Sequence, residues 1–418
     1  MRSPRASILR AVAVAGAFGA TAAAAPVAQA APNPTVNPGD LVISEFRFHG
    51  PNGANDEFFE IYNKTNTSID LNSDEDNSVF WIEYFAPTPE PADTVSIVPH
   101  SDSDVLPHTK YLMTNKPGDA SPGYSLDGYA FGDTETDVQS VGDVPSDGGI
   151  ALMYDSNVFD AVDERIVVDK AGFPNGKIPD DHYHHPGFTY FEGTAEPPIS
   201  ALTTQQYAHV RKFTGAGGQP LDTNNNASDF DFVVNASLST YAGQPSIQGA
   251  PGPENTGSPI LENDGATATP NDGMYSALMN TGVSSSTSPN RETAAGTPGT
   301  LIVRRRITNR TGHSVTSLRL RLTQLTTYGT ASATQALLRA TDIATATVAG
   351  EPALGAKVEQ PPTQTAGGGL NSTLVVPLNE DTGLTGGVLP NGGDVVVAIK
   401  FLVDRSGSYS FSYNHEAE

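Results

Sequence analysis

Hydrophobic residues occur in short alternating runs along most of the chain, and no long run repeats with the 3.6-residue period of a helix. The runs are rich in β-branched and aromatic residues and are bounded by Asn, Asp, Gly and Pro, as strands are. In the N-terminal half, the expected strands are 41–46, 58–62, 80–85, 110–114, 150–154 and 158–162. In the C-terminal half, they are 301–307, 318–325, 374–378, 395–403 and 409–413. Short strands separated by turn residues predict an all-β fold with one β-sandwich in each half.

Alternation within these runs predicts which side chains face a core. Leu41 and Ile43 alternate with Val42 and Ser44, so this strand should present one apolar face. Trp81 is the only tryptophan, and we expect it to fill a core, with stacking against a ligand as the alternative role.

Three acidic residues in and beside the first two runs, Glu45, Glu57 and Glu60, are candidates for a carboxylate cluster. Such a cluster suits acid–base chemistry or metal binding. The simpler interpretation is that the carboxylates bond to neighbouring backbone or lysine, because no nucleophile or electrophile stands beside them in the sequence.

The first thirty residues have the pattern of a signal peptide. An apolar run at 11–25 follows three arginines and precedes the small-x-small pattern of 28–30, which predicts cleavage before Ala31. We therefore expect an exported protein, either secreted or associated with the cell surface. A membrane anchor is the alternative, but this run of Ala-rich and Gly-rich sequence is shorter than the about 20 apolar residues that span a bilayer.

Charge is unevenly distributed along the 418 residues, whose net charge is −24. Residues 31–254 hold 9 basic and 34 acidic groups, a net charge of −25, whereas residues 255–418 hold 11 and 13, a net charge of −2. Near this boundary lies 248–257, rich in Gly and Pro, and a second loose stretch lies at 281–298. We therefore predict a signal peptide (1–30), a first domain (31–250), a linker (251–298) and a C-terminal β-sandwich domain (299–418).

A set of motifs follows in order between residues 38 and 250. The segments are Leu41 to Glu45, Glu57 to Thr65, Ile69 to Leu71, Trp81 to Tyr84, Leu106 to Leu112, Gly148 to Asp155 with Val158 to Val162, and Arg211-Lys212 with Asp222 to Phe230. In this order the motifs resemble those of the lamin tail domain family, and it is the order that carries the resemblance, since any one motif alone is weak.

The resemblance implies an immunoglobulin-like sandwich that serves binding and not chemistry. Bacterial members of the family occur on secreted and surface proteins, often beside nucleases or phosphoesterases. This sequence departs from the family pattern by inserted residues at 72–78 and by a long stretch at 173–198. Such loops are where a rigid sandwich would carry a specific ligand site.

Sequence patterns of common enzymes are missing. The chain has no cysteine, which excludes a thiol nucleophile, a disulfide scaffold and a zinc ribbon. G-x-S-x-G and H-E-x-x-H are absent, and 172–178 is one residue short of a P-loop. His182 and His184 would share a face of an extended segment and could bind a metal, although a solvated polar loop is the simpler interpretation. We therefore expect no enzymatic activity.

A candidate calcium site lies near the end of the first domain. Its oxygen ligands, at nearly alternate positions, are Asp222, Asn224, Asn226 and Asp229. Calcium prefers such ligands, and a strongly acidic extracellular domain gains from neutralisation. The EF-hand pattern is not met, because Ala227 stands where Gly is required and Val233 where Glu is required. The alternative is an Asx-turn loop that closes the fold. We expect no other cofactor.

Two basic segments of the second domain, 301–307 and 317–322, flank a loop and could pair as antiparallel strands. Leu318, Leu320 and Leu322 would face one side of the second strand. The other side would display a candidate binding surface made of Arg304, Arg306, Arg319 and Arg321. Like charges side by side destabilise a sheet, so these arginines need a source of neutralising negative charge. Its source could be solvent and counter-ions, an acidic polymer or nucleic acid, or the acidic first domain of the same chain.

Together these features predict an exported, non-enzymatic protein that binds or displays an extracellular protein or polymer. The alternatives are a targeting or accessory subunit of a secreted phosphoesterase or nuclease system, and a structural component of a surface layer. We expect no membrane-spanning segment. Direct nucleic-acid binding by the first domain is not expected, because such binding relies on Lys and Arg that neutralise phosphates.

Overall fold

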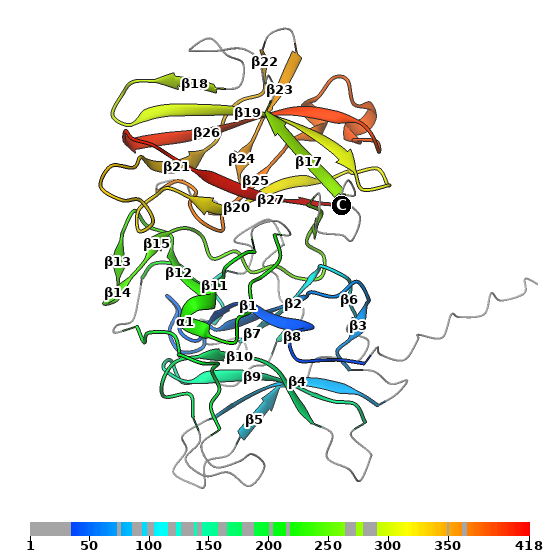
Figure 1. Cartoon of the computed structure of the whole chain (residues 1–418), viewed down its shortest axis with the longest axis vertical. Coiled ribbons are helices and arrows are strands. Elements are labelled where there is room, and N and C mark those ends of the chain that lie inside the picture. Colours follow the sequence, from blue (N-terminus) through cyan, green and yellow to red (C-terminus); the bar gives the residue numbers. More distant parts are fainter. Residues whose placement is uncertain are drawn as a thin grey trace, which may run out of the picture. The chain divides into compact units, whose positions relative to one another are not determined.

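The computed structural model shows an almost entirely β protein, which confirms the predicted fold class (Figure 1). It describes residues 35–72, 77–85, 94–97, 104–115, 123–126, 138–139, 144–157, 165–177, 188–199, 204–214, 218–263, 273–278, 291–348, 351–361 and 366–418. The predicted signal peptide, the expected strand at 158–162 and both His182 and His184 lie outside these ranges. Among the described residues, no helix has the length and apolar character needed to cross a membrane.

The first sandwich consists of a seven-stranded and a four-stranded sheet. The strands of the larger sheet are β1 (Leu41–Arg47), β2 (Phe58–Asn63), β7 (Lys110–Thr114), β8 (Val138–Gln139), β11 (Tyr207–Arg211), β12 (Phe230–Val234) and β15 (Ile247–Gln248), in the order β15-β12-β11-β1-β2-β7-β8. Those of the smaller sheet are β4 (Val79–Phe85), β5 (Thr94–Ile97), β9 (Gly149–Asp155) and β10 (Ile166–Gly172), in the order β10-β9-β4-β5. Short additional elements are β3 (Ile69–Asp70), β6 (Asp104–Val105), β13 (Thr240–Tyr241), β14 (Gln244–Pro245) and the helix α1 (Asn226–Asp229).

The main core of the first sandwich draws on both of its sheets. Ile43 and Phe46 of β1 and Phe59 of β2 share this core with Phe80 of β4 and Leu152 of β9, and all five are buried. Alternating apolar residues on the strands supply these side chains, as the sequence pattern predicts.

Trp81 lies in a smaller apolar cluster with Met153 and Tyr190. Its side chain is buried, and its indole nitrogen donates a hydrogen bond to Glu83 Oε2 at 3.1 Å. The expected role as a buried filler is therefore confirmed, although Trp81 does not belong to the main core.

A β-bulge in β1 decides which way Glu45 points. The register with β2 shifts between Ile43 and Glu45, so Ser44 is an extra residue without a cross-strand partner. Because one extra residue reverses the alternation, Phe46 joins Ile43 in the core and Glu45 points to the opposite face, where Glu60 is its partner. Strict alternation would instead direct the Glu45 carboxylate into the apolar core.

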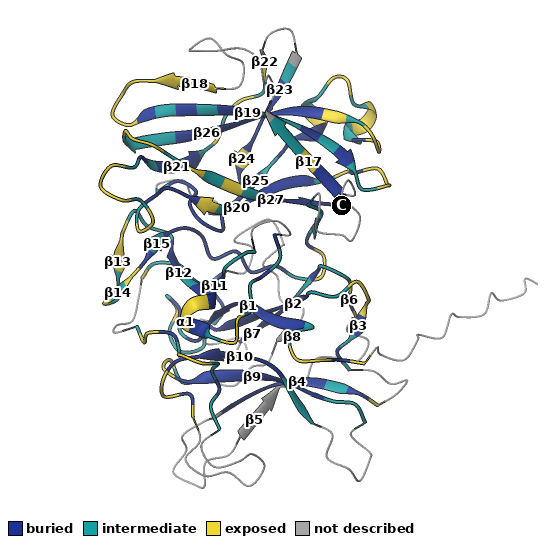
Figure 2. Ribbon diagram, viewed as in Figure 1, coloured by how far each residue is buried: buried dark blue, intermediate teal, exposed yellow. Residues whose placement is uncertain are grey.

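Both faces of β1 and β2 are covered. All residues of the two strands are buried, as their dark blue colour in Figure 2 shows. The sequence pattern predicts only one covered face for these strands. The second face is therefore covered by a contact that the pattern does not reveal.

The second sandwich also has two main sheets. One contains β16 (Ile260–Leu261), β20 (Leu318–Leu325), β24 (Lys357–Val358), β25 (Thr373–Val375) and β27 (Phe411–Ala417), in the order β16-β27-β20-β25-β24. The other contains β17 (Gly273–Leu278), β18 (Arg291–Ala294), β19 (Gly299–Arg310), β21 (Leu337–Thr341), β22 (Ala346–Val348), β23 (Glu351–Gly355) and β26 (Asp394–Arg405), in the order β17-β19-β26-β23-β22 with β18 on β19 and β21 on β26. Two 3-10 helices are η1 (Leu378–Glu380) and η2 (Thr385–Gly387). The strands β16, β17 and β18 come from the range 251–298, so part of the predicted linker belongs to this sandwich.

The two faces of β20 differ as the sequence predicts. Leu318, Leu320 and Leu322 belong to the core of the second sandwich. Arg319 and Arg321 alternate with them and are also buried. Since the leucines occupy the core face, the arginines lie on the outer face of their sheet.

Candidate functional site

The two sandwiches meet on the outer face of β1 and β2. Residues 32–418 form one unit, and among the described residues apolar contacts between the sandwiches occur at two places. Leu370 belongs to a cluster with Phe58, and Leu261 of β16 packs with Val42 and Tyr62. We call this contact zone, formed by β1, β2 and β7 on one side and by β16, β20 and β27 on the other, the junction.

The segment at 249–254, whose Gly and Pro residues predict a linker, is buried in the junction. The backbone nitrogen of Gly252 donates to Glu45 Oε1 at 2.9 Å, and that of Glu254 donates to Glu60 Oε2 at 2.7 Å. The connection between the sandwiches is thus fixed to the outer face of β1 and β2 by hydrogen bonds to buried carboxylates.

A group of buried charged side chains fills the centre of the junction. Arg319 and Arg321 of β20 both form ion pairs with Glu254 of the connecting segment and with Glu416 of β27. Their Nε atoms lie 2.8 and 2.5 Å from the two oxygens of Glu416. Lys110 of β7 adds a third cation, with Nζ 2.6 Å from Glu254 Oε2. Cations of both sandwiches therefore share the carboxylate of Glu254.

We call the full set of these groups the ion cluster. It comprises three cations and five carboxylates, Lys110, Arg319, Arg321, Glu45, Glu60, Glu254, Glu359 and Glu416. Burial, and then the neighbouring Glu60, raise the pKa of Glu45 to about 8, and burial also raises the pKa of Glu60. Burial opposes ionisation of Glu416 as well, but Arg321 and Arg319 outweigh it and lower its pKa to about 2. Ion pairs between these cations and carboxylates offset part of the cost of burying them.

Glu57, the third acid of the predicted carboxylate cluster, lies apart from these groups. Its Oε1 accepts a hydrogen bond from the backbone nitrogen of Val144 at 2.7 Å, and its Oε2 accepts one from Asn115 at 3.1 Å. Glu45 and Glu60 likewise accept hydrogen bonds from backbone nitrogens, and Lys110 lies 3.5 Å from Glu60. The simpler of the two interpretations, bonding to backbone and lysine, is therefore confirmed.

The predicted surface of four arginines is not formed. The prediction that segments 301–307 and 317–322 pair as antiparallel strands is wrong, because β19 and β20 belong to different sheets of the second sandwich. Arg304 lies 3.2 Å from Glu292, and Arg306 forms an ion pair with Asp394. Arg319 and Arg321 are buried in the ion cluster, where their acidic partners are Glu254 from the acidic part of the chain and Glu416 of the second sandwich.

A cavity of about 580 Å³ lies beside the ion cluster. The first sandwich contributes the end of β11, the residues after it and one residue of β12 to its wall; the second contributes β17, β20 and β27. Its lining consists of Val210, Arg211, Lys212, Phe213, Thr214, Asp231, Asn263, Met274, Tyr275, Ser276, Thr323, Gln324, Leu370, Asn371, Ser412, Tyr413, Asn414 and His415. Because both sandwiches contribute to its wall, the cavity exists only while the two sandwiches are in contact at the junction.

A chain of hydrogen bonds fixes the side-chain amides at one side of the cavity. The carbonyl oxygen of Gly218 can only accept, so Asn414 turns its nitrogen toward it at 2.7 Å and its oxygen toward Asn263 Nδ2 at 2.8 Å. Asn263 Oδ1 then accepts from the backbone nitrogen of His415 at 2.8 Å and lies 3.1 Å from Nδ1 of the same residue. His415 must therefore carry its proton on Nδ1. Burial lowers the pKa of this imidazole to about 4, so the ring is neutral.

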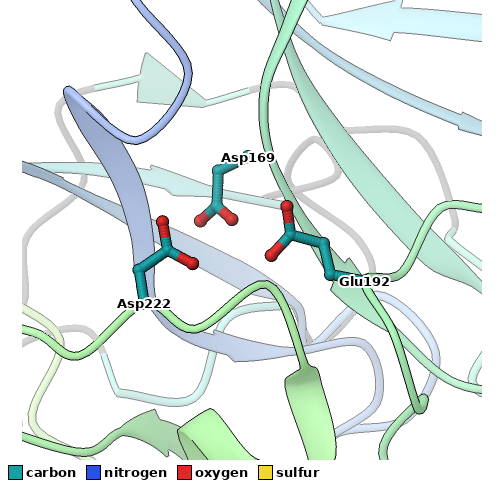
Figure 3. Close-up of side chains that lie close together, drawn as sticks. All are labelled: Asp169, Glu192 and Asp222. Atoms are coloured by element: carbon teal, nitrogen blue, oxygen red, sulfur yellow. The ribbon is translucent and has the colours of Figure 1, made fainter.

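A separate group of carboxylates lies in the first sandwich. Asp169 of β10, Glu192 and Asp222 bring carboxylate oxygens within 4.8 Å of one another, and Figure 3 shows the three side chains pointing toward one another. Arg211 lies among them, with Nη2 2.5 Å from Asp169 and Nη1 3.5 Å from Asp222. Burial, together with Asp169 and Asp222, raises the pKa of Glu192 to about 8. The oxygens have the spacing of a cation site, but a guanidinium already supplies positive charge there.

Of the four predicted calcium ligands, only Asp222 belongs to this group. The oxygen of Asn226 accepts hydrogen bonds from two backbone nitrogens at 3.1 and 3.2 Å. Asp229 accepts one from the backbone nitrogen of Thr223 at 2.9 Å, and Asp222 accepts one from that of Asn224 at 3.1 Å. Asp222 and Asp229 thus hold the backbone of their own loop, as the Asx-turn alternative predicts, whereas Asn226 ties the loop to the backbone of Gly172 and Glu192.

No family model, no curated protein and no solved structure matches this chain. The resemblance to lamin tail domains therefore rests on the sequence motifs, and the case for a function rests on the junction and its cavity.

Proposed function

We propose that the chain is an exported, non-enzymatic binding module of the lamin tail type whose ligand site is the cavity at the junction. The observation that carries the proposal is the cavity itself, about 580 Å³ in volume and lined by strands of both sandwiches. Small-molecule sites have volumes of about 300–1,000 Å³ and occur preferentially at interfaces between domains. The signal-peptide pattern supports an extracellular ligand, and the lamin-tail motifs support a role in binding.

The chemistry of the lining supports binding over catalysis. Ser276 Oγ lies 2.6 Å from the hydroxyl of Tyr413, but burial raises the pKa of this tyrosine above its ordinary value. Tyr413 is therefore a poor base for activating the serine. Lys212 and Asp231 lie 3.6 Å apart and neutralise each other. Among the lining residues that the structure describes, we find no nucleophile that is hydrogen-bonded to a competent base.

A substitution that fills the cavity tests the proposal without knowledge of the ligand. Ser412 is exposed and lines the cavity, so Ser412→Trp places an indole in it. The matched control is Leu238→Trp, because Leu238 is exposed and lies outside the cavity. The mature chain, residues 31–418, and both variants are incubated with insoluble cell-wall polymer, with soluble capsular polymer and with culture proteins.

We expect one fraction to retain the mature chain and the control variant but not Ser412→Trp. Equal retention of all three proteins, or of none, would contradict the proposal. Circular dichroism melting curves of the three proteins separate loss of binding from loss of folding.

A further inference from the structure

The lining of the cavity carries no unbalanced charge. Its charged residues are Arg211, Lys212 and Asp231. Arg211 is fully buried and is engaged with Asp169, while Lys212 is paired with Asp231. A phosphate or carboxylate ligand needs an available cation for charge-assisted hydrogen bonds. Among the described lining residues, no cation is left for that purpose, so the cavity favours an uncharged ligand.

The polar atoms of the lining suit a ligand with many hydroxyl groups. A second β-bulge, between Leu322 and Gln324 of β20, leaves Thr323 without a cross-strand partner and brings neighbouring polar side chains to the cavity. Gln324 Oε1 accepts a hydrogen bond from Ser412 at 3.2 Å. Within the described residues, the Gln324 amide nitrogen and the Thr323 hydroxyl make no hydrogen bond. Amide and hydroxyl groups can both donate to and accept from the hydroxyls of one ligand.

Aromatic rings complete the lining. Tyr275 of β17 is 38% exposed, and Phe213 and Tyr413 also border the cavity. The guanidinium of Arg310 lies 4.3 Å from the ring centroid of Tyr275 and covers one face of it. An aromatic ring combines an apolar surface with a polar edge, so it can pack against the C–H groups of a sugar ring while neighbouring groups bind its hydroxyls.

We propose that the cavity binds a neutral oligosaccharide, with Tyr275 packing against a sugar ring and with Gln324 and Thr323 binding its hydroxyls. The inference rests on the proposed function and specifies its ligand. The volume of about 580 Å³ accommodates roughly two or three sugar rings. A polymer end and a free oligosaccharide present the same rings and hydroxyls, so the cavity would accept either.

Calorimetric titration of the mature chain with neutral trisaccharides tests the inference. The probes are cellotriose, maltotriose, mannotriose and the trimer of N-acetylglucosamine, with trigalacturonate as a charged comparison and a Gly-Ser peptide as a non-sugar comparison. We expect at least one neutral trisaccharide to bind, with an affinity that does not depend on salt because no charges are screened. Trigalacturonate and the peptide should not bind.

Variants locate the bound sugar. Tyr275→Ala should weaken binding roughly tenfold, whereas Tyr275→Phe, which keeps the ring, should leave it nearly unchanged. Gln324→Ala should weaken binding roughly fivefold. Leu238→Ala is the control outside the cavity. All these positions are exposed, so the variants should fold like the parent protein.

Two outcomes would overturn the inference. In the first, no neutral trisaccharide binds although Ser412→Trp still abolishes retention on a polymer or protein fraction; the cavity then binds another class of ligand and the proposed function stands. In the second, a trisaccharide binds the parent and Tyr275→Ala equally, and the sugar site then lies elsewhere. Failure of both the titration and the retention experiment would remove the proposed function as well.

Two treatments of the retained fraction distinguish a saccharide ligand from a peptide ligand. Treatment of the retained fraction with periodate, which cleaves vicinal diols, should release the mature chain if the ligand is a saccharide with such diols. Proteolysis of the fraction should release it if the ligand is a peptide, and that result contradicts the inference.

Discussion

The two faces of β1 and β2 are equally buried but are built from different chemistry. On one face, Ile43, Phe46 and Phe59 join an apolar core. On the other, Glu45 and Glu60 lie opposite each other in the ion cluster. An apolar face can be closed by any apolar partner of the right shape. The ionic face can be closed only by a partner whose cations lie in matching positions. We infer that the ionic face favours one arrangement of the second sandwich against the first, and a cavity shared between them needs such an arrangement.

The largest expected effect comes from breaking the ion cluster. Arg321→Met keeps much of the side-chain length but leaves Glu416 and Glu254 without one of their cations. We expect a loss of about 3–5 kcal/mol in the free energy of unfolding, because an uncompensated buried charge remains. The matched control is Arg306→Met, since Arg306 and Asp394 form a pair whose side chains are 36% and 40% exposed. The control should cost less than about 1 kcal/mol. Urea denaturation measures both, and equal losses would show that the ionic face is no more demanding than the surface.

Acid should weaken the second sandwich through His415. Its pKa is about 4 in the folded chain and 6.5 ordinarily, so the unfolded chain takes up the proton first as the pH falls. Stability that is fully present above pH 6.5 is therefore lost on the way to about pH 4, by roughly 3 kcal/mol. Urea denaturation at a series of pH values measures the effect. His415→Asn, which retains a donor for Asn263, should remove this part of the pH dependence. An unchanged profile in that variant would mean that other groups cause the loss.

The ion cluster should respond to pH in the opposite direction. The pKa of Glu45 is raised to about 8, so the folded chain holds a proton that the unfolded chain releases near its ordinary pKa. The associated stability is present at low pH and is lost as the pH rises through about 8. Between pH 6.5 and 8 we expect a loss of roughly 2 kcal/mol in the parent protein. Glu45→Gln should flatten this slope, whatever it does to the absolute stability. Denaturation midpoints at the two pH values measure the slope, and an equally steep slope in Glu45→Gln would contradict the assignment.

Calcium should have the smallest effect. Arg211 already lies among Asp169 and Asp222, and the oxygens of Asn226 and Asp229 bond to backbone nitrogens. We therefore expect the same melting midpoint in EDTA and in millimolar calcium. A midpoint that rises with calcium concentration would show that the ion binds the folded chain, and it would restore the site predicted from the sequence.

The sequence predicts the local elements of this fold better than their partners. The alternation of Leu318, Leu320 and Leu322 with Arg319 and Arg321 is enough to separate the two faces of β20. It does not reveal where the arginines go, because their partners Glu254 and Glu416 are 65 and 97 positions away from Arg319. The hairpin expected from neighbouring basic segments fails for the same reason. Strands that follow each other in the sequence need not pair in a sandwich.

Two features of the candidate site carry no signal in a single sequence. The bulge at Ser44 turns Glu45 toward the junction, and one extra residue in a strand does not alter the pattern of residue types in a recognisable way. The cavity combines segments that lie near positions 212, 275, 324 and 413, so only the folded chain brings them together.

Fluorescence of Tyr275→Trp tests most directly whether a ligand enters the cavity. Trp81 is the only natural tryptophan and is buried, so a change on ligand addition would come from the new indole. We expect the emission to shift to shorter wavelength as the retained polymer or a bound trisaccharide is added, because the ligand displaces water from the ring. Leu238→Trp, outside the cavity, should show no shift. An unchanged spectrum of Tyr275→Trp at saturating ligand would place binding elsewhere and contradict the account.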